Sequence, residues 1–254
     1  MLTLLGPTAS GKTTLAAHLA HRIGGEIISA DSRQVYRRMD IGTGKDLSDY
    51  VVEGQAIPYH LIDICEPGER YNLFRYTQDF QKAYDDITSR GRIPILCGGT
   101  GLYIEAVLRG YYSQPGSLTL RGACDAHSSL FTLHSSLIFG LMLSRDERRA
   151  RISRRLDQRL QEGMVEEVDG LLRSGVSAER LLRYGLEYRY VTLYLLGQLT
   201  YEQMHDRLEI AIHQFAKRQM TWFRGMEERR GIPIHWIDAL LPTAQQIEII
   251  MQFI

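Results

Sequence analysis

The stretch from residue 6 to residue 13 reads Gly-Pro-Thr-Ala-Ser-Gly-Lys-Thr and constrains the fold of this chain more than any other feature. It matches the pattern G-x-x-x-x-G-K-[ST] and lies between a short apolar run, residues 2–5, and a helical pattern that follows. The two glycines let the backbone curve until successive N–H groups point inward, and the helix adds the positive end of its dipole. The stretch therefore predicts a phosphate-binding loop (P-loop) between a buried strand and a helix.

Two side chains of this loop carry specific chemistry. Lys12 is expected to contact the outer phosphate of a di- or triphosphate as a point charge. The Thr13 hydroxyl is expected to bind a Mg²⁺ ion that it shares with phosphate oxygens. A glycine-rich turn without a ligand is the alternative, and it is disfavoured because strand, loop and helix follow one another as the motif requires.

The composition is that of one main globular domain. The 254 residues are 44% hydrophobic and 24% charged, which excludes the disordered and fibrous classes. No apolar run approaches the roughly 20 residues that span a membrane, and no secretory signal precedes the loop. We therefore expect a cytoplasmic, monomeric protein without membrane contact. Its three cysteines lack the spacing of metal ligands or of a disulfide framework.

The basic residues are unusual because 26 of the 30 are arginine, although the net charge is zero. Seven of these arginines fall within residues 145–159, which contain only three acidic residues. Such a segment can be an ordinary solvated helix face, or it can be a basic wall that faces a diphosphate or a nucleic acid. The sequence leaves both interpretations open.

Strands and helices alternate along the first half of the chain. Apolar runs predict strands at 26–30, 58–64 and 93–97, and an amphipathic helix begins at Leu73. Further strands are predicted at 137–141 and 232–237, with helices from about 145 to 230, broken near Gly163, and a terminal helix from Thr243. This order predicts the α/β class, with a parallel sheet flanked by helices and a helical second half.

Two polar side chains stand where predicted strands end, and glycines surround one of them. Asp31 follows the strand at 26–30, and Thr100 lies within a Gly-Gly-Thr-Gly sequence after the strand at 93–97. Carboxyl ends of parallel strands meet at one edge of a sheet, so both side chains should face the same crevice as the phosphate-binding loop. A kinase would use the carboxylate to orient an acceptor hydroxyl or to hold Mg²⁺. A transferase that breaks a carbon–oxygen bond would instead release the diphosphate while Asp31 takes a proton, and these residues alone do not decide between the two.

Five motifs, taken in order, resemble the tRNA dimethylallyltransferases (tRNA isopentenyltransferases). They are GPTASGKT at 6–13, ISADSRQVY at 28–36 with MDIGT at 39–43, HLID at 60–63, GGTGLY at 98–103 and AKRQMTWFR at 216–224. The resemblance implies transfer of a dimethylallyl group from dimethylallyl diphosphate to N6 of adenosine-37, next to the tRNA anticodon, with the help of Mg²⁺. The implied partners are dimethylallyl diphosphate and the tRNA anticodon stem-loop.

The resemblance also implies roles for individual residues. Asp31 would be the general base on the N6 amine, and Thr100 would hydrogen-bond at the reacting centre, with the adenine flipped out of its loop. The metal ligand would be Thr13. The diphosphate would be held by Gly6, Pro7, Thr8, Ala9, Ser10, Gly11, Lys12, Thr13, Thr14 and Arg183. The tRNA would be contacted by Asp31, Ser32, Arg33, Gln34, Thr100 and Arg218.

This chain departs from the family pattern at residues 112–136, where a reduced, irregular insertion replaces the longer helical insertion of the family. We expect residues 1–111 and 137–254 to form the P-loop core with its helical C-terminal part. A family that prenylates free AMP, ADP or ATP needs no such insertion, so an adenylate isopentenyltransferase is the alternative. A non-catalytic paralogue that binds RNA or a nucleotide is a further alternative. The aromatic residues Tyr36, Trp222 and Phe223 are expected to pack in the core.

Overall fold

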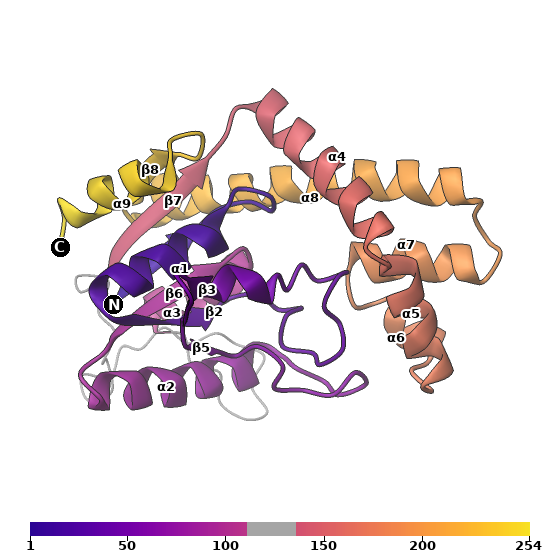
Figure 1. Cartoon of the computed structure of the whole chain (residues 1–254), viewed down its shortest axis with the longest axis horizontal. Coiled ribbons are helices and arrows are strands. Elements are labelled where there is room, and N and C mark those ends of the chain that lie inside the picture. Colours follow the sequence, from indigo (N-terminus) through magenta and orange to yellow (C-terminus); the bar gives the residue numbers. More distant parts are fainter. Residues whose placement is uncertain (111–135) are drawn as a thin grey trace.

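The computed structural model describes residues 1–110 and 136–254, and its centre is a six-stranded parallel sheet (Figure 1). The strand order is β5-β2-β6-β1-β7-β8. The strands are β1 (Leu2–Leu5), β2 (Gly25–Ser29), β5 (Tyr59–His60), β6 (Ile93–Gly98), β7 (Leu137–Met142) and β8 (His235–Asp238). The predicted α/β class with a parallel sheet is confirmed. The predicted insertion at 112–136 lies, apart from its last residue, outside the described residues.

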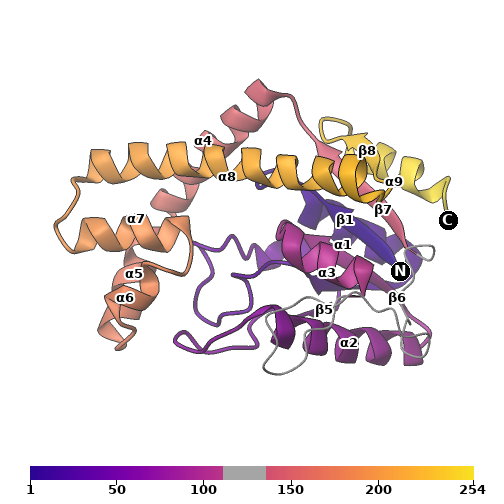
Figure 2. The same cartoon turned by 180° about the vertical axis from the view of Figure 1, so that it is seen from behind.

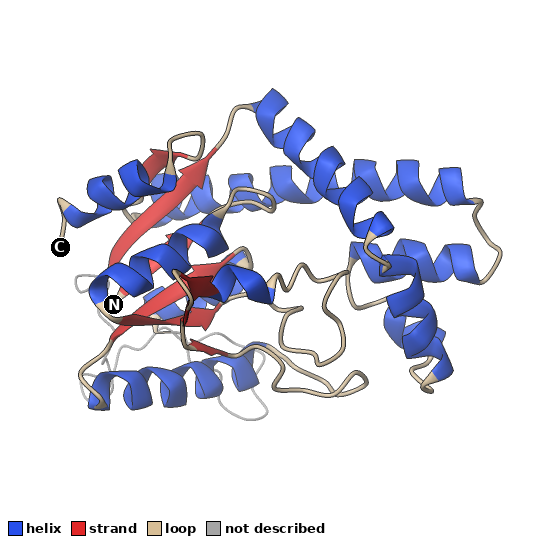
Figure 3. Ribbon diagram, in the orientation of Figure 1, coloured by secondary structure: helices blue, strands red, loops and turns tan. Residues whose placement is uncertain are grey.

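Helices cover both faces of the sheet (Figure 3). The helices are α1 (Lys12–Ile23), α2 (Leu73–Ser89), α3 (Gly101–Arg109), α4 (Arg145–Gln161), α5 (Met164–Arg173), α6 (Ala178–Leu181), α7 (Leu186–Leu195), α8 (Tyr201–Arg230) and α9 (Thr243–Met251). A short 3₁₀ helix (Leu47–Tyr50) precedes the small hairpin of β3 (Val51–Val52) and β4 (Gln55–Ala56). Among these elements, no helix combines the length and the apolar character needed to cross a bilayer.

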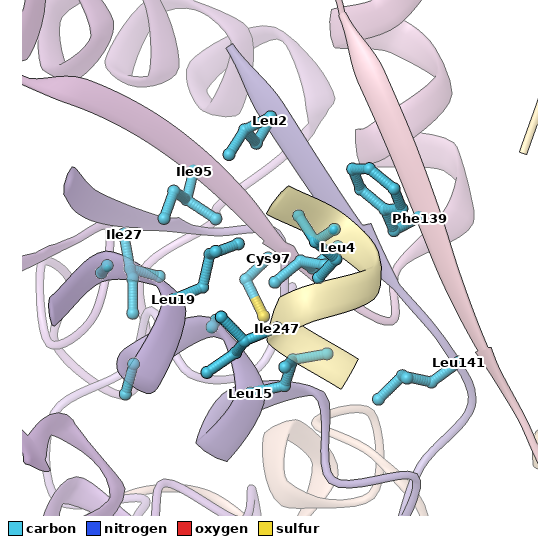
Figure 4. Packing of buried hydrophobic residues seen from close by; sticks show 14 of the residues in the cluster. Leu2, Leu4, Leu15, Leu19, Ile27, Ile95, Cys97, Phe139, Leu141 and Ile247 are labelled. Carbon is cyan, nitrogen blue, oxygen red and sulfur yellow. The ribbon is translucent and has the colours of Figure 1, made fainter. Parts of the chain in front are cut away.

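The apolar strands divide their side chains between two cores, because successive residues of a strand point to opposite faces. Leu4 and its neighbours on one face pack against α1 and α9, as Figure 4 shows for Leu15, Leu19 and Ile247. On the other face, Leu5 packs with residues of α2, α3 and the C-terminal half of α8. Burial on both faces is what an apolar parallel strand requires, so β1 is fixed at the centre of the sheet.

A third core holds the helical lobe, in which α4 and α7 pack on the N-terminal half of α8, while α5 and α6 pack on α7 (Figure 2). The 30-residue α8 connects this lobe with the sheet. Thr200 and Gln203 form a capping box at its start, and Gly231 ends it in the left-handed conformation. The predicted break near Gly163 is confirmed, because this residue separates α4 from α5 with a φ of 102°.

Two predicted strands are shorter than the sequence analysis expected. The strand predicted at 58–64 contains only Tyr59 and His60, because Leu61 and Asp63 adopt positive φ values of 63° and 54° and leave the extended conformation. The strand predicted at 232–237 begins at His235. Apolar residues before it are buried without joining the sheet, since Ile232 hydrogen-bonds to the end of α8 instead.

Candidate active site

The phosphate-binding loop leaves the central strand β1 and leads directly into α1. Gly11 has a φ of 86°, and Ala9 has a φ of 61°, so the backbone bends sharply twice before the helix begins. No side chain in the described part of the chain caps the N-terminus of α1, and no acidic residue lies in its first turn. The N–H groups of that turn are therefore available to an anion, which the helix dipole attracts to the same point.

Lys12 is placed for the same ligand and lies in a strongly basic environment. Burial lowers the pKa of Lys12, and the nearby Arg155 and Arg159 lower this pKa further, whereas Cys97 and Asp31 raise it. Of these three cations, Arg159 is buried and Lys12 and Arg155 are partly buried, so their mutual repulsion costs free energy unless an anion joins them. This arrangement favours a ligand that carries several negative charges.

A cavity of about 530 Å³ connects the loop with the carboxyl ends of β2 and β6. The predicted site residues Thr8, Lys12, Thr13, Asp31, Ser32, Arg33, Gln34, Thr100, Arg183 and Arg218 all line it. The others, Ala9, Ser10, Gly11 and Thr14, line a neighbouring cavity of about 270 Å³ on the other side of the loop, while Gly6 and Pro7 are buried at the start of the loop.

Hydrogen bonds hold Asp31 within its own loop and join Thr100 to the loop that follows β2. The carboxylate oxygen Oδ1 of Asp31 accepts a hydrogen bond from the Arg33 N–H at 2.9 Å. The Thr100 Oγ1 accepts one from the Ser32 N–H at 3.1 Å, and its own N–H donates to Ala30 O at 3.1 Å. Within the described residues, Asp31 Oδ2 accepts no hydrogen bond, so it is available to a ligand. The close approach of the strands requires Gly98, because a Cβ atom there would lie 2.3 Å from Ala30 O.

Gln219 joins the two loops of the site from α8, a role that the sequence analysis missed. Its Oε1 accepts a hydrogen bond from the Thr8 N–H at 2.9 Å, and its Nε2 donates to Gly99 O at 2.8 Å. The side chain is buried. Gln219 lies in the AKRQMTWFR motif, and the motif was the only signal in the sequence that could have pointed to it.

Two arginines of the segment 145–159 lie beside the phosphate-binding loop. They are Arg155 and Arg159, and both approach one carboxylate oxygen, Oδ2 of Asp46, at 2.6 Å and 3.8 Å. Arg159 is only 8% exposed, and its Nη2 makes no hydrogen bond with any described residue. These two arginines form a basic wall beside the phosphate-binding loop, which is one of the two interpretations that the sequence left open.

Arg183, which the sequence analysis assigned to the diphosphate, has a different environment. Its guanidinium pairs with Glu179 at 2.7 Å, and both side chains are 76% exposed. Arg155 is therefore better placed beside the loop than Arg183, and the role of Arg183 stays a prediction. A second residue that the sequence analysis missed is Glu187, which lines the cavity. Burial raises its pKa, while Arg159 and Arg155 oppose this change.

The residues around Thr13 are compatible with Mg²⁺. No group of three or more His, Cys, Asp or Glu side chains forms a ready metal site in residues 1–110 and 136–254. However, Asp46 and Asp49 line the cavity that contains Thr13, and burial and the neighbouring Asp46 raise the pKa of Asp49. Mg²⁺ typically binds one or two protein oxygens together with substrate phosphates, so this donor set fits the ion once a diphosphate is bound.

All three aromatic residues pack on the core as predicted, and one of them also borders the cavity. Tyr36 and Phe223 are buried in the core, as expected. The prediction is confirmed in part for Trp222, which is partly buried and packs against the same core as Phe223 but also lines the cavity opposite Gly101. Its indole Nε1 finds no hydrogen-bond partner among the described residues. The helical spacing identified the correct face of α8 for Phe223 and could not reveal that the adjacent position borders a cavity.

Comparison with known proteins agrees with the geometry of the site. A family described as IPP transferase matches residues 34–137 and 126–226, and one described as isopentenyl transferase matches residues 1–57. The chain is 54% identical to tRNA dimethylallyltransferase 1 of Porphyromonas gingivalis, over 99% of this chain and 98% of that protein. It belongs to the tRNA dimethylallyltransferase family. The relative from Parabacteroides distasonis is 52% identical over 100% of this chain and 97% of its own.

Solved structures of the family share the fold. The tRNA isopentenylpyrophosphate transferase of Staphylococcus epidermidis superimposes with a TM-score of 0.83 at 26% identity, covering 99% of this chain and 97% of the other. The corresponding enzyme of Bacillus halodurans gives a TM-score of 0.83 at 28% identity, covering 99% and 94%. The arrangement of the sheet and the helical lobe is therefore that of the family.

Proposed function

We propose that this protein transfers a dimethylallyl group from dimethylallyl diphosphate to N6 of adenosine-37 in tRNA and releases diphosphate. One observation supports this proposal above the others: Lys12 of the phosphate-binding loop and the carboxylate of Asp31 line the same cavity. The phosphate-binding loop can thus hold the diphosphate that leaves, while Asp31 takes a proton from the acceptor amine in the same cavity. Membership of the family supports the identity of both substrates.

The diphosphate would bind with its oxygens on the N–H groups at the start of α1. Lys12 and Arg155 would neutralise the negative charge that develops when the carbon–oxygen bond of the substrate breaks. Because Lys12 is partly buried, its charge is less screened by water there and interacts more strongly with the diphosphate than it would in bulk solvent. Thr13 would hold Mg²⁺ with Asp49 and the diphosphate, and the ion supplies further neutralisation of the leaving group.

The acceptor side requires a base, because the exocyclic amine of adenine is a poor nucleophile. As the bond from N6 to the allylic carbon forms, Asp31 Oδ2 would take the proton that N6 loses, while the Arg33 N–H keeps the carboxylate oriented. The apolar side chains Ile212 and Phe215 and the indole of Trp222 line the same cavity. They would hold the dimethylallyl group and keep water away from the developing allylic cation.

The polar side chains Ser32, Arg33 and Gln34 and the guanidinium of Arg218 line the cavity as well and would contact the RNA. Gln34 is held in place, since its Nε2 donates to Gly44 O at 3.1 Å. An adenine inside a stacked loop cannot reach Asp31, so the base must flip out into the cavity before it reacts.

Replacing Arg155 and Arg183 one at a time tests which of the two arginines binds the diphosphate. Arg155→Ala is expected to raise KM for dimethylallyl diphosphate by about tenfold or more, because a charge-assisted contact to phosphate is lost. Arg183→Ala is expected to change this KM by less than about threefold, since its guanidinium is exposed and paired with Glu179. Steady-state kinetics at saturating RNA measure both values. A larger effect of Arg183→Ala would support the role that the sequence resemblance implied.

The function is tested by offering two acceptors in parallel. The protein is incubated with Mg²⁺ and labelled dimethylallyl diphosphate, and with either an adenosine-37 anticodon stem-loop or free AMP. We expect label on the stem-loop. We also expect EDTA to abolish transfer, because Mg²⁺ held by Thr13 and the nearby carboxylates would neutralise the charge of the leaving diphosphate. Label on AMP alone would identify an adenylate isopentenyltransferase. Label on neither acceptor would contradict the proposal and favour a non-catalytic paralogue.

A further inference from the structure

A carboxylate lies among the cations of the active site, where a bound diphosphate would repel it. It belongs to Glu187, in the first turn of α7, and this side chain lines the active-site cavity together with Arg155 and Arg159. Asp31 already serves as the base, so the proposed reaction leaves Glu187 without a task. A negative charge at this place weakens diphosphate binding unless it acts through one of the neighbouring cations.

The backbone brings Glu187 to the cavity by a turn that requires glycine. Gly185, the residue before α7, has a φ of 136° and a ψ of −178°, a conformation that residues with a Cβ atom rarely adopt. α7 therefore begins at the cavity wall, and Gly185, Leu186 and Glu187 all line it. The positive end of the helix dipole attracts a carboxylate in this first turn.

Arg159 is the cation on which Glu187 acts most strongly. Burial lowers the pKa of Arg159, and the nearby Arg155 lowers this pKa further. Among the carboxylates that oppose the change, Glu187 has the largest effect, ahead of Asp46. Burial raises the pKa of Glu187 in turn, and Arg159 opposes that change more than any other group does. Because Asp46 approaches Arg155 more closely, at 2.6 Å against 3.8 Å, Glu187 is the main counter-charge of Arg159.

The two side chains act on each other across a small cavity. No direct ion pair joins them within residues 1–110 and 136–254, but Glu187, Arg159 and Arg155 all line a cavity of about 20 Å³. A water molecule needs roughly 10–15 Å³ and a few polar partners, so this cavity can hold one. The buried Nη2 of Arg159 has no hydrogen-bond partner in the described part of the chain and can donate to such a water molecule.

We propose that Glu187 is a positioning residue, which holds the guanidinium of Arg159 beside the phosphate-binding loop through a water molecule in this small cavity. An ordered Arg159 loses less conformational freedom when a diphosphate binds, and this gain offsets the direct repulsion between Glu187 and the ligand. The inference rests on the proposed function for the identity of the ligand, dimethylallyl diphosphate.

The test is a double-mutant cycle on the binding of dimethylallyl diphosphate with Mg²⁺, measured by calorimetry without RNA. Glu187→Ala is expected to weaken binding about fivefold, because Arg159 loses its counter-charge. In an Arg159→Met background the same change should leave binding unchanged or strengthen it, because only the repulsion between Glu187 and the ligand remains. Glu187→Gln keeps a hydrogen-bond acceptor for the water molecule, so its affinity should lie between those of Glu187→Ala and the wild type.

Turnover separates a positioning residue from a base. Glu187→Gln should raise KM for dimethylallyl diphosphate and leave kcat within about twofold of the wild type, whereas loss of a general base lowers kcat about 10²-fold or more. The control variant is Asp169→Ala on α5, which removes the carboxylate that pairs with the exposed Arg173 at 2.5 Å. Its affinity for dimethylallyl diphosphate should equal that of the wild type.

Three results would overturn the inference: equal weakening by Glu187→Ala in both backgrounds, tighter binding by the single Glu187→Ala variant, or a large fall in kcat for Glu187→Gln. Absence of binding by the wild type would overturn it as well. If the wild type binds dimethylallyl diphosphate but transfers no prenyl group to RNA, the proposed function fails, and the binding cycle still decides whether Glu187 acts through Arg159.

Discussion

Replacing Asp31 with asparagine is expected to lower kcat for prenyl transfer by about 10²- to 10⁴-fold, the usual contribution of a positioned general base. Asparagine has the same shape, and its carbonyl oxygen can still accept the hydrogen bond from the Arg33 N–H, which measures 2.9 Å to Oδ1 in the native protein. The variant loses the ability to take the N6 proton. KM values for both substrates should change little, because Asp31 acts on the proton rather than on binding. Single-turnover transfer of labelled dimethylallyl diphosphate measures the chemical step.

The matched control is Asp86→Asn on α2, where the carboxylate is 60% exposed and pairs with Arg90. This variant should retain full activity. Thermal unfolding should show the same melting temperature for Asp31→Asn as for the wild type, which would separate a chemical effect from a folding defect. If kcat of Asp31→Asn fell by less than about tenfold, Asp31 would not be the base. Glu187, whose carboxylate also lines the cavity, would then be the next candidate.

The phosphate-binding loop and the convergence of Asp31 with Thr100 could be predicted because both depend on local or general rules. The loop motif is contiguous, and its strand and helix are its immediate neighbours in the sequence. Asp31 and Thr100 are 69 residues apart, yet each follows a buried strand, and parallel strands bring their carboxyl ends to one edge. The rule placed these two side chains at the same cavity without any knowledge of the strand order.

Residues contributed by the helical lobe could not be predicted in the same way. Gln219 bonds to Thr8 across 211 residues of sequence, and Arg155 reaches the loop only because α4 packs across α8. Hydrophobic periodicity shows which face of α4 is apolar, and it does not show what lies opposite the arginines beside that face. The assignment of Arg183 to the diphosphate came from the resemblance to the family and stays a prediction, whereas Arg155 became a candidate only once the packing of α4 was known.

Glu167 supports the loop at residues 40–44 in a way that no local pattern revealed. Its carboxylate accepts hydrogen bonds from three consecutive backbone N–H groups, those of Asp40, Ile41 and Gly42, at 2.8, 2.7 and 3.1 Å. The Tyr188 hydroxyl donates a fourth hydrogen bond, at 2.6 Å. One side chain of α5 thus fixes a loop whose later residues, including Gly44, line the active-site cavity.

Glu167→Ala is expected to lower the free energy of unfolding by about 3–5 kcal/mol, because it leaves several donors without an acceptor at once. Chemical denaturation measures this difference. Glu166→Ala, on the adjacent residue of the same helix, should cost less than about 1 kcal/mol, the value of a carboxylate near a helix N-terminus. Equal losses in the two variants would contradict the role of Glu167.

The same variant should also affect the active site, because the loop and Arg159 are in contact. A Cβ atom on Gly44 would lie within 1.9 Å of Arg159 Nη2, so the guanidinium rests directly on the loop backbone. When the loop loses its anchor, Arg159 loses this support, and we expect KM for dimethylallyl diphosphate to rise while Asp31 and its hydrogen bonds stay intact. An increase in this KM without a matching fall in kcat would indicate that Glu167 positions the basic wall beside the phosphate-binding loop and not the general base.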